Sequence, residues 1–202
     1  MQRRAFTLIE LLIVVAIIAI LAAIAVPNFL EAQTRAKVSR AKSDMRSVAT
    51  AIESYAVDNN AYPVPIGYTG PNEADRIDPA TEPFEGFVPE KVSTPIAYIT
   101  VRPLDTFRVK NPDEHPYDIP FHFSNQKFNA EALSEPNFMA NLHQELTGNA
   151  VQIPWLIFSH GPDLSHQSGP PDADPPCLYD PTNGTVSIGD IYYFGAGGGI
   201  PK

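Results

Sequence analysis

The chain has 202 residues and a formal net charge of −9 at neutral pH. Its length indicates one domain, and its acidic balance argues against nucleic acid as a partner, because phosphate backbones attract basic surfaces. Cys177 is the only cysteine, so no intramolecular disulfide can form. Residues 1–60 contain 7 Lys or Arg and 5 Asp or Glu, whereas residues 61–202 contain 7 and 18, a balance of −11. Such an acidic C-terminal part is compatible with binding a divalent cation.

The N-terminal segment, residues 6–27, begins with an apolar run in which Glu10 is the only charged residue. A helix over residues 6–26 would be about 32 Å long, enough to cross the hydrocarbon core of a bilayer. The apolar core of a secretory signal peptide is shorter, about 7–15 residues, so a retained transmembrane or assembly helix is the better interpretation. Arg3 and Arg4 precede the run, and the positive-inside rule places that end in the cytoplasm.

Residues 28–60 keep the helical periodicity but become amphipathic. Their apolar positions fall three or four residues apart, along one face of a helix. These positions are Val38, Ala41, Met45, Val48, Ile52 and Tyr55. Pro27 lies where the apolar and amphipathic parts meet, and an internal proline removes a backbone hydrogen bond and kinks a helix. We therefore expect one long, bent helix, apolar all round in its first half and packed on a globular domain along its second.

The remaining residues, 61–202, hold 20 of the 21 prolines, which excludes long helices. One or two short helices fit within residues 129–148. Short apolar segments bounded by proline and glycine predict strands. These segments cover residues 96–100, 121–124, 154–159, 184–188 and 190–194. The expected fold class is α+β, with the long N-terminal helix packed on a small antiparallel β-sheet that carries long proline-rich loops.

The N-terminal sequence RRAFTLIELLIVVAIIAILAAIAVPNFLEAQTRAK resembles the leader and helix of type IV pilins and type II secretion pseudopilins. The resemblance implies that a prepilin peptidase cuts between Ala5 and Phe6 and so removes a cytoplasmic leader, residues 1–5. It also implies that the new amino group of Phe6 is N-methylated. One position departs from the family: the residue before the cut is usually glycine, and here it is Ala5.

Glu10 is the one unusual residue of the apolar run, because a carboxylate in hydrocarbon is costly and generally marks a function. After cleavage, the positive amine of Phe6 would lie about one helical turn from Glu10. In a filament, the carboxylate of one subunit can neutralise the amine of a neighbour. Together with the resemblance, this implies that Glu10 acts in filament assembly. The alternative is a side chain that reaches the lipid headgroups from near the helix end.

The closing segment resembles the last loop of major pseudopilins, which binds calcium in that family. The resemblance lies in a Ser-x-Gly-x-Asp turn, an acidic stretch and an Asp-Ile pair. The calcium ligands that it implies are Ser159, Asp163, Asp172, Asp174 and Asp190. Calcium takes six to eight oxygen ligands, which a flexible acidic loop can supply. The alternative is that these are solvated carboxylates that help to form turns.

No enzyme signature is present. The five histidines lack the spacing of zinc motifs. Ser159, His160 and Asp163 are the residue types of a catalytic triad, yet their nearness in sequence does not indicate triad geometry, and no nucleophile-elbow motif surrounds Ser159. We therefore expect a structural protein, not an enzyme.

We interpret the chain as a structural subunit of a helical filament, the pseudopilus of a type II secretion system. Its partners would be further copies of itself, minor pseudopilins, the prepilin peptidase and an inner-membrane assembly platform. It would span the bacterial inner membrane once, with residues 61–202 in the periplasm, before it enters a periplasmic or surface filament. A type IV pilin and a minor pseudopilin are alternatives within the family. An alternative of another class is a monomeric, membrane-anchored periplasmic binding protein.

Overall fold

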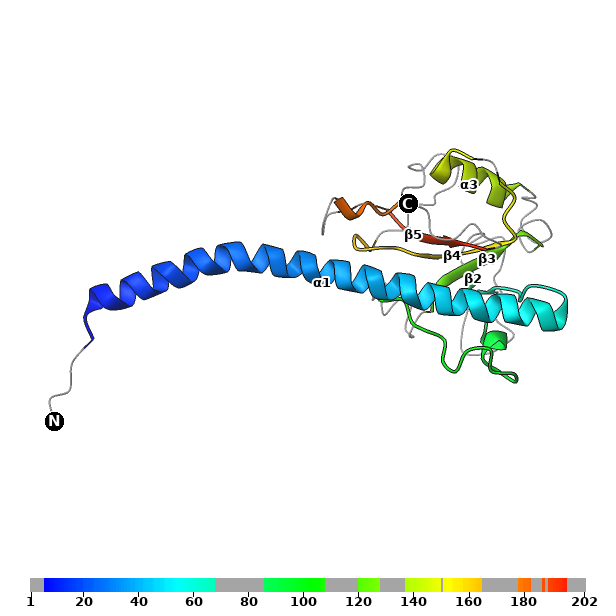
Figure 1. The fold of residues 1–202 in the computed structure, drawn as a ribbon, viewed down its shortest axis with the longest axis horizontal. Helices are drawn as coiled ribbons and strands as arrows, with labels where there is room; N and C mark the ends of the chain where they lie inside the picture. Colours follow the sequence, from blue (N-terminus) through cyan, green and yellow to red (C-terminus); the bar gives the residue numbers. More distant parts are fainter. Residues whose placement is uncertain are drawn as a thin grey trace.

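The fold is dominated by one long helix at the N-terminus. The computed structural model describes residues 6–67, 86–107, 120–127, 137–149, 151–164, 178–182, 187 and 189–195. Helix α1 runs over Leu8–Asn59 and ends at Asn60, which adopts the left-handed conformation typical of a helix C-terminus. Pro27 lies inside α1 without interrupting it, and the ribbon curves gently along its length (Figure 1). The expected long helix is therefore present, and it bends without breaking.

The globular part is built on a five-stranded antiparallel sheet whose strands follow one another in chain order. The strands are β1 Ile66–Gly67, β2 Gly86–Phe87, β3 His122–Asn125, β4 Trp155–Ser159 and β5 Ile191–Phe194. A short 3-10 helix, η1 Glu90–Val92, follows β2, and helix α3 Phe138–Thr147 lies between β3 and β4. This arrangement confirms the predicted α+β class and the small antiparallel sheet.

The sheet separates two apolar clusters. Alternate residues of β4 point to opposite faces, as in any strand: Trp155 and Ile157 pack against α1, whereas Leu156 and Phe158 face the α3 side. The α1 cluster includes the buried residues Val38, Ala41, Met45, Val48 and Ile52, together with Phe121 and Phe123. The other cluster includes Met139, Leu142, Ile153, Tyr192 and Phe194. Figure 1 shows α1 and α3 on opposite sides of β4 and β5, so each sheet face has its own helix.

Most of the strand predictions are confirmed to within one residue. The strands expected at 121–124, 154–159 and 190–194 are β3, β4 and β5, and α3 lies within the expected helical segment. Of the strand expected at 184–188, only Ser187 belongs to the described residues.

The strand expected at 96–100 is wrong. This segment is a series of bends beside the far end of α1. Its backbone hydrogen bonds are made within the loop, since Tyr98 N–H donates to the carbonyl of Ile96 and Ile99 N–H to that of Val92. The ring of Tyr98 packs edge-on against Tyr55 of α1. Tyr98 and Ile99 of this segment therefore pack against the α1 cluster and add no strand to the sheet.

A carboxylate joins α1 to the sheet in addition to the apolar packing. Glu53 accepts a hydrogen bond from the indole N–H of Trp155 at 2.9 Å and another from the Tyr62 hydroxyl at 3.3 Å. Burial, with the nearby charge of Glu53 as a second cause, raises the pKa of Tyr62 above its usual value. Charge-assisted bonds of this kind are stronger than neutral ones, so Glu53 fixes the helix to the middle of the domain.

Candidate functional site

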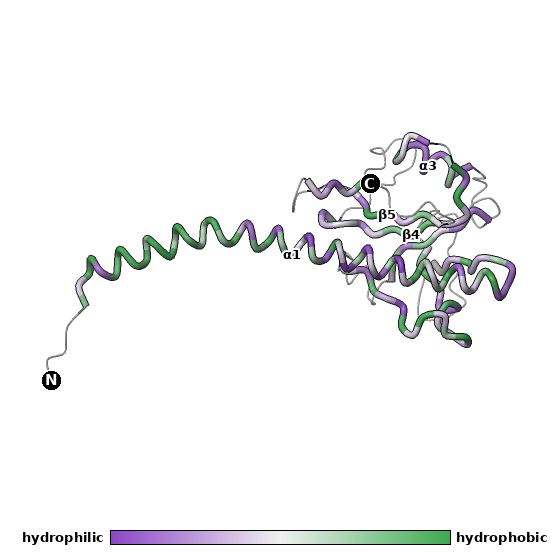
Figure 2. Tube along the Cα trace, in the orientation of Figure 1, coloured by the Kyte–Doolittle hydropathy of each residue, from purple (hydrophilic) through white to green (hydrophobic). Residues whose placement is uncertain are grey.

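The first half of α1 is not packed against any other described part of the chain. Every residue from Phe6 to Leu30 is exposed, and the side chain of Ile18, for example, is 59% exposed. Figure 2 shows this projecting part as an almost continuous hydrophobic stretch, interrupted near its start. The helix is long and apolar enough to cross a membrane. Because apolar surface in water is unfavourable, this segment needs a cover of lipid or of other protein.

The start of the helix is closed by a reciprocal cap between Thr7 and Glu10. The backbone N–H and the hydroxyl of Thr7 donate to one Glu10 carboxylate oxygen at 2.9 and 2.7 Å. In return, Thr7 Oγ accepts the backbone N–H of Glu10 at 3.4 Å. This is a capping box, the pairing of Thr and Glu three residues apart that opens many helices. Within a single copy, the Glu10 carboxylate is therefore hydrogen-bonded to its own chain.

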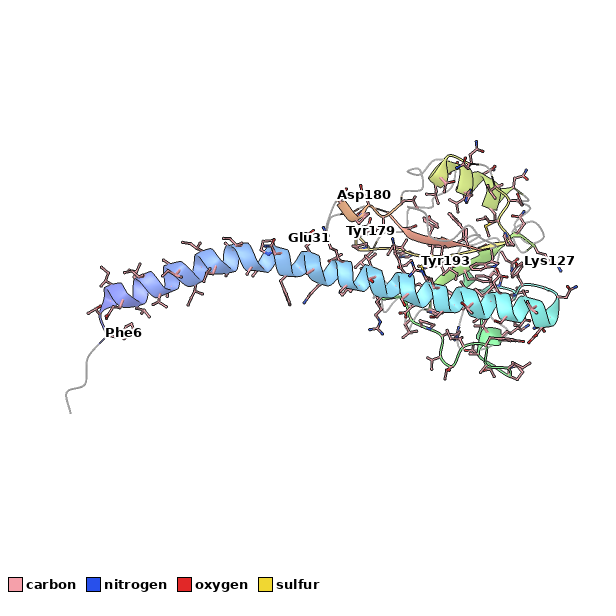
Figure 3. All side chains as sticks on the ribbon, viewed as in Figure 1. Phe6, Glu31, Lys127, Tyr179, Asp180 and Tyr193 are labelled. Atoms are coloured by element: carbon pink, nitrogen blue, oxygen red, sulfur yellow. The ribbon has the colours of Figure 1, made fainter. Side chains whose placement is uncertain are left out.

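The predicted cleavage site lies just before this cap. Phe6 immediately precedes Thr7 and is 75% exposed, while Ala5 and the rest of the leader lie outside the described residues. In Figure 3, Phe6 marks the end of the helix that is farthest from the domain. An amine created at Phe6 would therefore stand at the tip of the apolar segment, next to the capping box.

The near edge of the domain meets α1 where the apolar segment ends. Figure 3 shows Tyr179 and Asp180 close to the helix, beside Glu31. The ammonium group of Lys42 lies 5.9 Å from the centre of the Tyr179 ring, within the range of a cation–π contact. Glu31 forms an ion pair with Arg35 one turn further along the helix. Polar and aromatic contacts thus mark the change from the uncovered to the packed half of α1.

The closing segment brings together part of the set of residues predicted to bind calcium. Ser159 ends β4, and its partner in the sheet register is Ile191, the residue after Asp190. Both Ser159 and Asp190 are fully buried. The Ser159 hydroxyl donates to Asp105 at 2.7 Å, and the Tyr192 hydroxyl donates to Asp190 at 3.1 Å.

Gly161 packs the Ser-x-Gly-x-Asp turn against the start of β5. It has a positive φ of 72°, and a Cβ at this position would lie 2.5 Å from the carbonyl oxygen of Gly189. Only glycine fits such a close approach at a left-handed position. Asp163 is half-buried later in the same turn, while Asp172 and Asp174 lie outside the described residues. Within the described part of the chain, no three Asp, Glu, His or Cys residues are close enough to hold a metal ion.

Sequence reasoning missed Asp105 and the partner of Glu10. Asp105 is 5% exposed, and besides Ser159 it accepts the backbone N–H of Phe107 at 2.9 Å. Nothing local in the sequence connects Asp105 with a serine 54 positions further along the chain. The Thr7–Glu10 cap, by contrast, has a sequence signal in the spacing Thr-x-x-Glu ahead of an apolar run.

Comparison with known proteins finds relatives mainly through the helix. The model of the prokaryotic N-terminal methylation motif matches residues 1–26. The type IV major pilin protein PilA of Myxococcus xanthus is 52% identical over 61 residues, which is 30% of this chain and 28% of that protein. The type II secretion system core protein G of Pseudomonas aeruginosa is 48% identical over 66 residues, 31% of this chain and 46% of that protein. The matches thus span less than half the length of these two relatives. No solved structure matches.

One of the relatives is matched over half of this chain. The type II secretion system core protein G of Escherichia coli K12 is 31% identical over 107 residues, which is 50% of this chain and 74% of that protein. The motif match, the long helix and the antiparallel sheet agree with this relationship. The chain belongs to the family of type IV pilins and type II secretion pseudopilins, which are filament subunits and not enzymes.

Proposed function

We propose that this protein is a subunit of the pseudopilus of a type II secretion system. The observation that carries the proposal is the apolar half of α1, which is uncovered from Phe6 to Leu30 and carries one carboxylate, Glu10, near its tip. Lipid can cover this surface before assembly, and neighbouring copies can cover it afterwards. The match to the Escherichia coli core protein G extends over 107 residues, against 61 for the Myxococcus xanthus pilin, which favours secretion over a type IV pilus.

Assembly would proceed through a change of partner at Glu10. The precursor would lie in the inner membrane with its leader in the cytoplasm, and prepilin peptidase would cut between Ala5 and Phe6. In the single copy, the Glu10 carboxylate is held by Thr7. In the filament it would turn to the methylated Phe6 amine of a neighbour, because a full positive charge shielded from water attracts the carboxylate more strongly than the uncharged donors of Thr7 do. The assembly platform and minor pseudopilins would act on this step.

The experiment that tests the proposal replaces Glu10 with Ala and compares the membrane fraction with the sheared filament fraction. We expect the variant to be inserted and retained in the membrane but to disappear from filaments. Glu31→Ala is the matched control, because it removes an exposed carboxylate of the same helix beyond the apolar run. The mass of the N-terminal peptide, beginning at Phe6 with one added methyl group, would establish processing.

The alternative function, that of a monomeric membrane-anchored binding protein, predicts a different result. Such a protein would keep its function and location in the Glu10→Ala variant, and no filament would form from the native chain. A native chain whose N-terminal peptide still begins at Met1 would also favour the anchored protein over the filament subunit. A minor pseudopilin would be processed in the same way but would be present at few copies per filament, which quantification of the sheared fraction measures.

Calcium binding by the closing segment is a second proposal. Its support is that Ser159 and Asp190 lie at the same end of neighbouring strands, with the turn of Asp163 beside them. Asp172 and Asp174 would complete the set of oxygen ligands. Since Ser159 and Asp190 already have hydrogen-bond partners in Asp105 and Tyr192, calcium would have to compete with them.

The test of the calcium proposal is the melting temperature of the full chain in detergent, with calcium and with chelator. A ligand that binds only the folded state raises the melting temperature. We expect chelator to lower it, and the Asp190→Asn variant to lose the difference. Equal melting temperatures in the two conditions would leave these residues as a hydrogen-bonded end of the sheet.

A further inference from the structure

The charges on α1 are divided along its axis. Residues 35–46 contain five Lys or Arg and one Asp, whereas residues 47–67 contain two acidic residues, Glu53 and Asp58, and no Lys or Arg. One end of the domain-bearing helix is therefore basic and the other acidic. In a stack of parallel, axially displaced copies, such a division brings opposite charges together between copies.

At the basic end, Arg46 has an unfavourable neighbour within its own chain. Lys42 lies one turn before Arg46, and like charges four residues apart destabilise a helix. Burial, with the charge of Arg46 as a second cause, lowers the pKa of Lys42. Among the described residues, the ion pairs join Arg35 with Glu31, Arg40 with Asp44, and Arg102 with Glu90. The exposed guanidinium of Arg46 belongs to none of them.

At the acidic end, Asp58 is also placed unfavourably. It lies in the last turn of α1, where the negative end of the helix dipole disfavours a carboxylate, and this turn contains no basic residue. Its side chain is exposed and accepts a hydrogen bond from an uncharged donor, the Tyr98 hydroxyl, at 2.9 Å. Arg46 and Asp58, neither of which forms an ion pair with another described residue, would neutralise each other between copies.

We propose that Arg46 of one copy pairs with Asp58 of a second copy in the filament, an inference that rests on the proposed function. Arg46 and Asp58 are 12 residues apart, so the two copies would be displaced by about 18 Å along the helix axis. The two side chains leave the helix in directions about 120° apart. A contact between two different patches of identical subunits gives a ring if the rotation closes, but one that also displaces each copy along the axis cannot close and generates an open helical filament.

The pair would join different neighbours from those joined at the N-terminus. Pairing of a Phe6 amine with Glu10 needs a displacement of about one helical turn, roughly 6 Å. The Arg46–Asp58 displacement is about three times larger, so it would link copies several steps apart in the stack. The N-terminal pair would set the step, and the second pair would tie successive turns of the assembly together.

The test is a charge exchange in the full-length protein. We expect Arg46→Glu and Asp58→Lys each to lower the amount of sheared filament about tenfold or more, because like charges would then face each other across the interface. The combined variant should restore assembly to within about twofold of the native level. Lys37→Glu is the matched control, since it is the same kind of charge reversal on about the opposite side of the helix from Arg46 and should assemble normally. Unchanged circular dichroism and melting temperature would show that all variants fold.

The other outcomes separate this inference from the proposed function. Native-like assembly of both single variants would overturn the Arg46–Asp58 pair while the filament function stands. If Arg46→Glu alone fails, Asp58→Lys does not rescue it, and Arg46→Glu also binds anionic vesicles less tightly, the arginine serves lipid headgroups and the pair is wrong. Absence of filaments from the native chain would remove the proposed function and the inference together. A disulfide between cysteines placed at 46 and 58, in a Cys177→Ser background, would confirm the contact directly.

Discussion

The two halves of α1 have the same backbone and opposite surroundings. From Leu8 to Leu30 every residue is exposed, whereas from Val38 to Ile52 the apolar face is buried against the sheet. The difference lies in the sequence pattern: the first half is apolar all round, and the second has a single apolar stripe. One stripe is enough for one partner, the sheet of the same chain. An apolar surface on all sides requires partners on all sides, which lipid or several other copies can supply.

This contrast shows where the free energy of burial is gained. Each buried Val, Ile, Leu or Met contributes about 1.5–3 kcal/mol. In the second half of α1 that contribution is already made when the domain folds. In the first half it depends on the environment, so the same helix carries the stability of the domain at one end and the capacity to assemble at the other.

The largest expected difference between the two halves of α1 is in how much domain stability is lost when one apolar side chain of each half is truncated. Met45 is fully buried in the α1 cluster, so Met45→Ala should destabilise the domain by about 2–5 kcal/mol. Ile13 is 54% exposed, and Ile13→Ala should leave the domain unchanged. Thermal unfolding of both variants in detergent, followed by near-UV circular dichroism, measures the difference. Equal losses would mean that the two halves fold as one unit.

A smaller difference in stability is expected when two carboxylates of α1, Glu53 and Glu31, are removed in turn. Glu53→Ala leaves the Trp155 indole N–H without its acceptor at the interface between helix and sheet, and should cost about 1–3 kcal/mol. Glu31→Ala removes one partner of an exposed ion pair and should cost less than about 0.5 kcal/mol. Urea unfolding of the two variants provides the comparison. A cost at Glu31 as large as that at Glu53 would contradict the assignment of Glu53 as the polar link to the sheet.

The smallest expected effect is a loss of stability at alkaline pH, caused by ionisation of Tyr62. Since the folded state raises the pKa of Tyr62 above its ordinary value near 10, it binds this proton more tightly than the unfolded state does. The contribution of the phenol to stability is therefore complete below about pH 10 and is lost as the pH rises through the raised value. The melting temperature of the native protein should fall above that pH. The melting temperature of the Tyr62→Phe variant should fall less steeply over the same pH range. An identical slope for the variant would assign the alkaline loss to other groups.

The parts of the fold that the sequence could predict are those that depend on local pattern. The stripe of Val38 to Ile52 predicted which face of α1 is buried, and the apolar segments of β3, β4 and β5 predicted those strands. The segment 96–100 has the same composition as a strand but packs on α1 through Tyr98. Composition alone does not distinguish these two ways of burying an apolar residue. The burial of both faces of β4 also depends on α3, a contact between distant segments.

The candidate site divides in the same way. Glu10 could be singled out as a candidate because a charge in an apolar run is conspicuous in the sequence, and the Thr-x-x-Glu spacing of its cap is also local. Asp105 could not be predicted as the partner of Ser159, since the two residues meet only when the loop after η1 folds back on the end of β4. The proposed Arg46–Asp58 contact would join two copies, so neither the sequence pattern nor the structure of a single chain displays it.

The order of the strands has a consequence for how the domain is made. Because β1 to β5 lie side by side in the order of synthesis, none of these five described strands has to be inserted between two that are already paired. In the proposed orientation, the chain behind the membrane-held helix would be delivered gradually to the periplasm. Each strand would then find its neighbour already in position, and α1 would serve as the surface on which the sheet grows. A domain with this topology can take shape during translocation, before its last residues have left the cytoplasm.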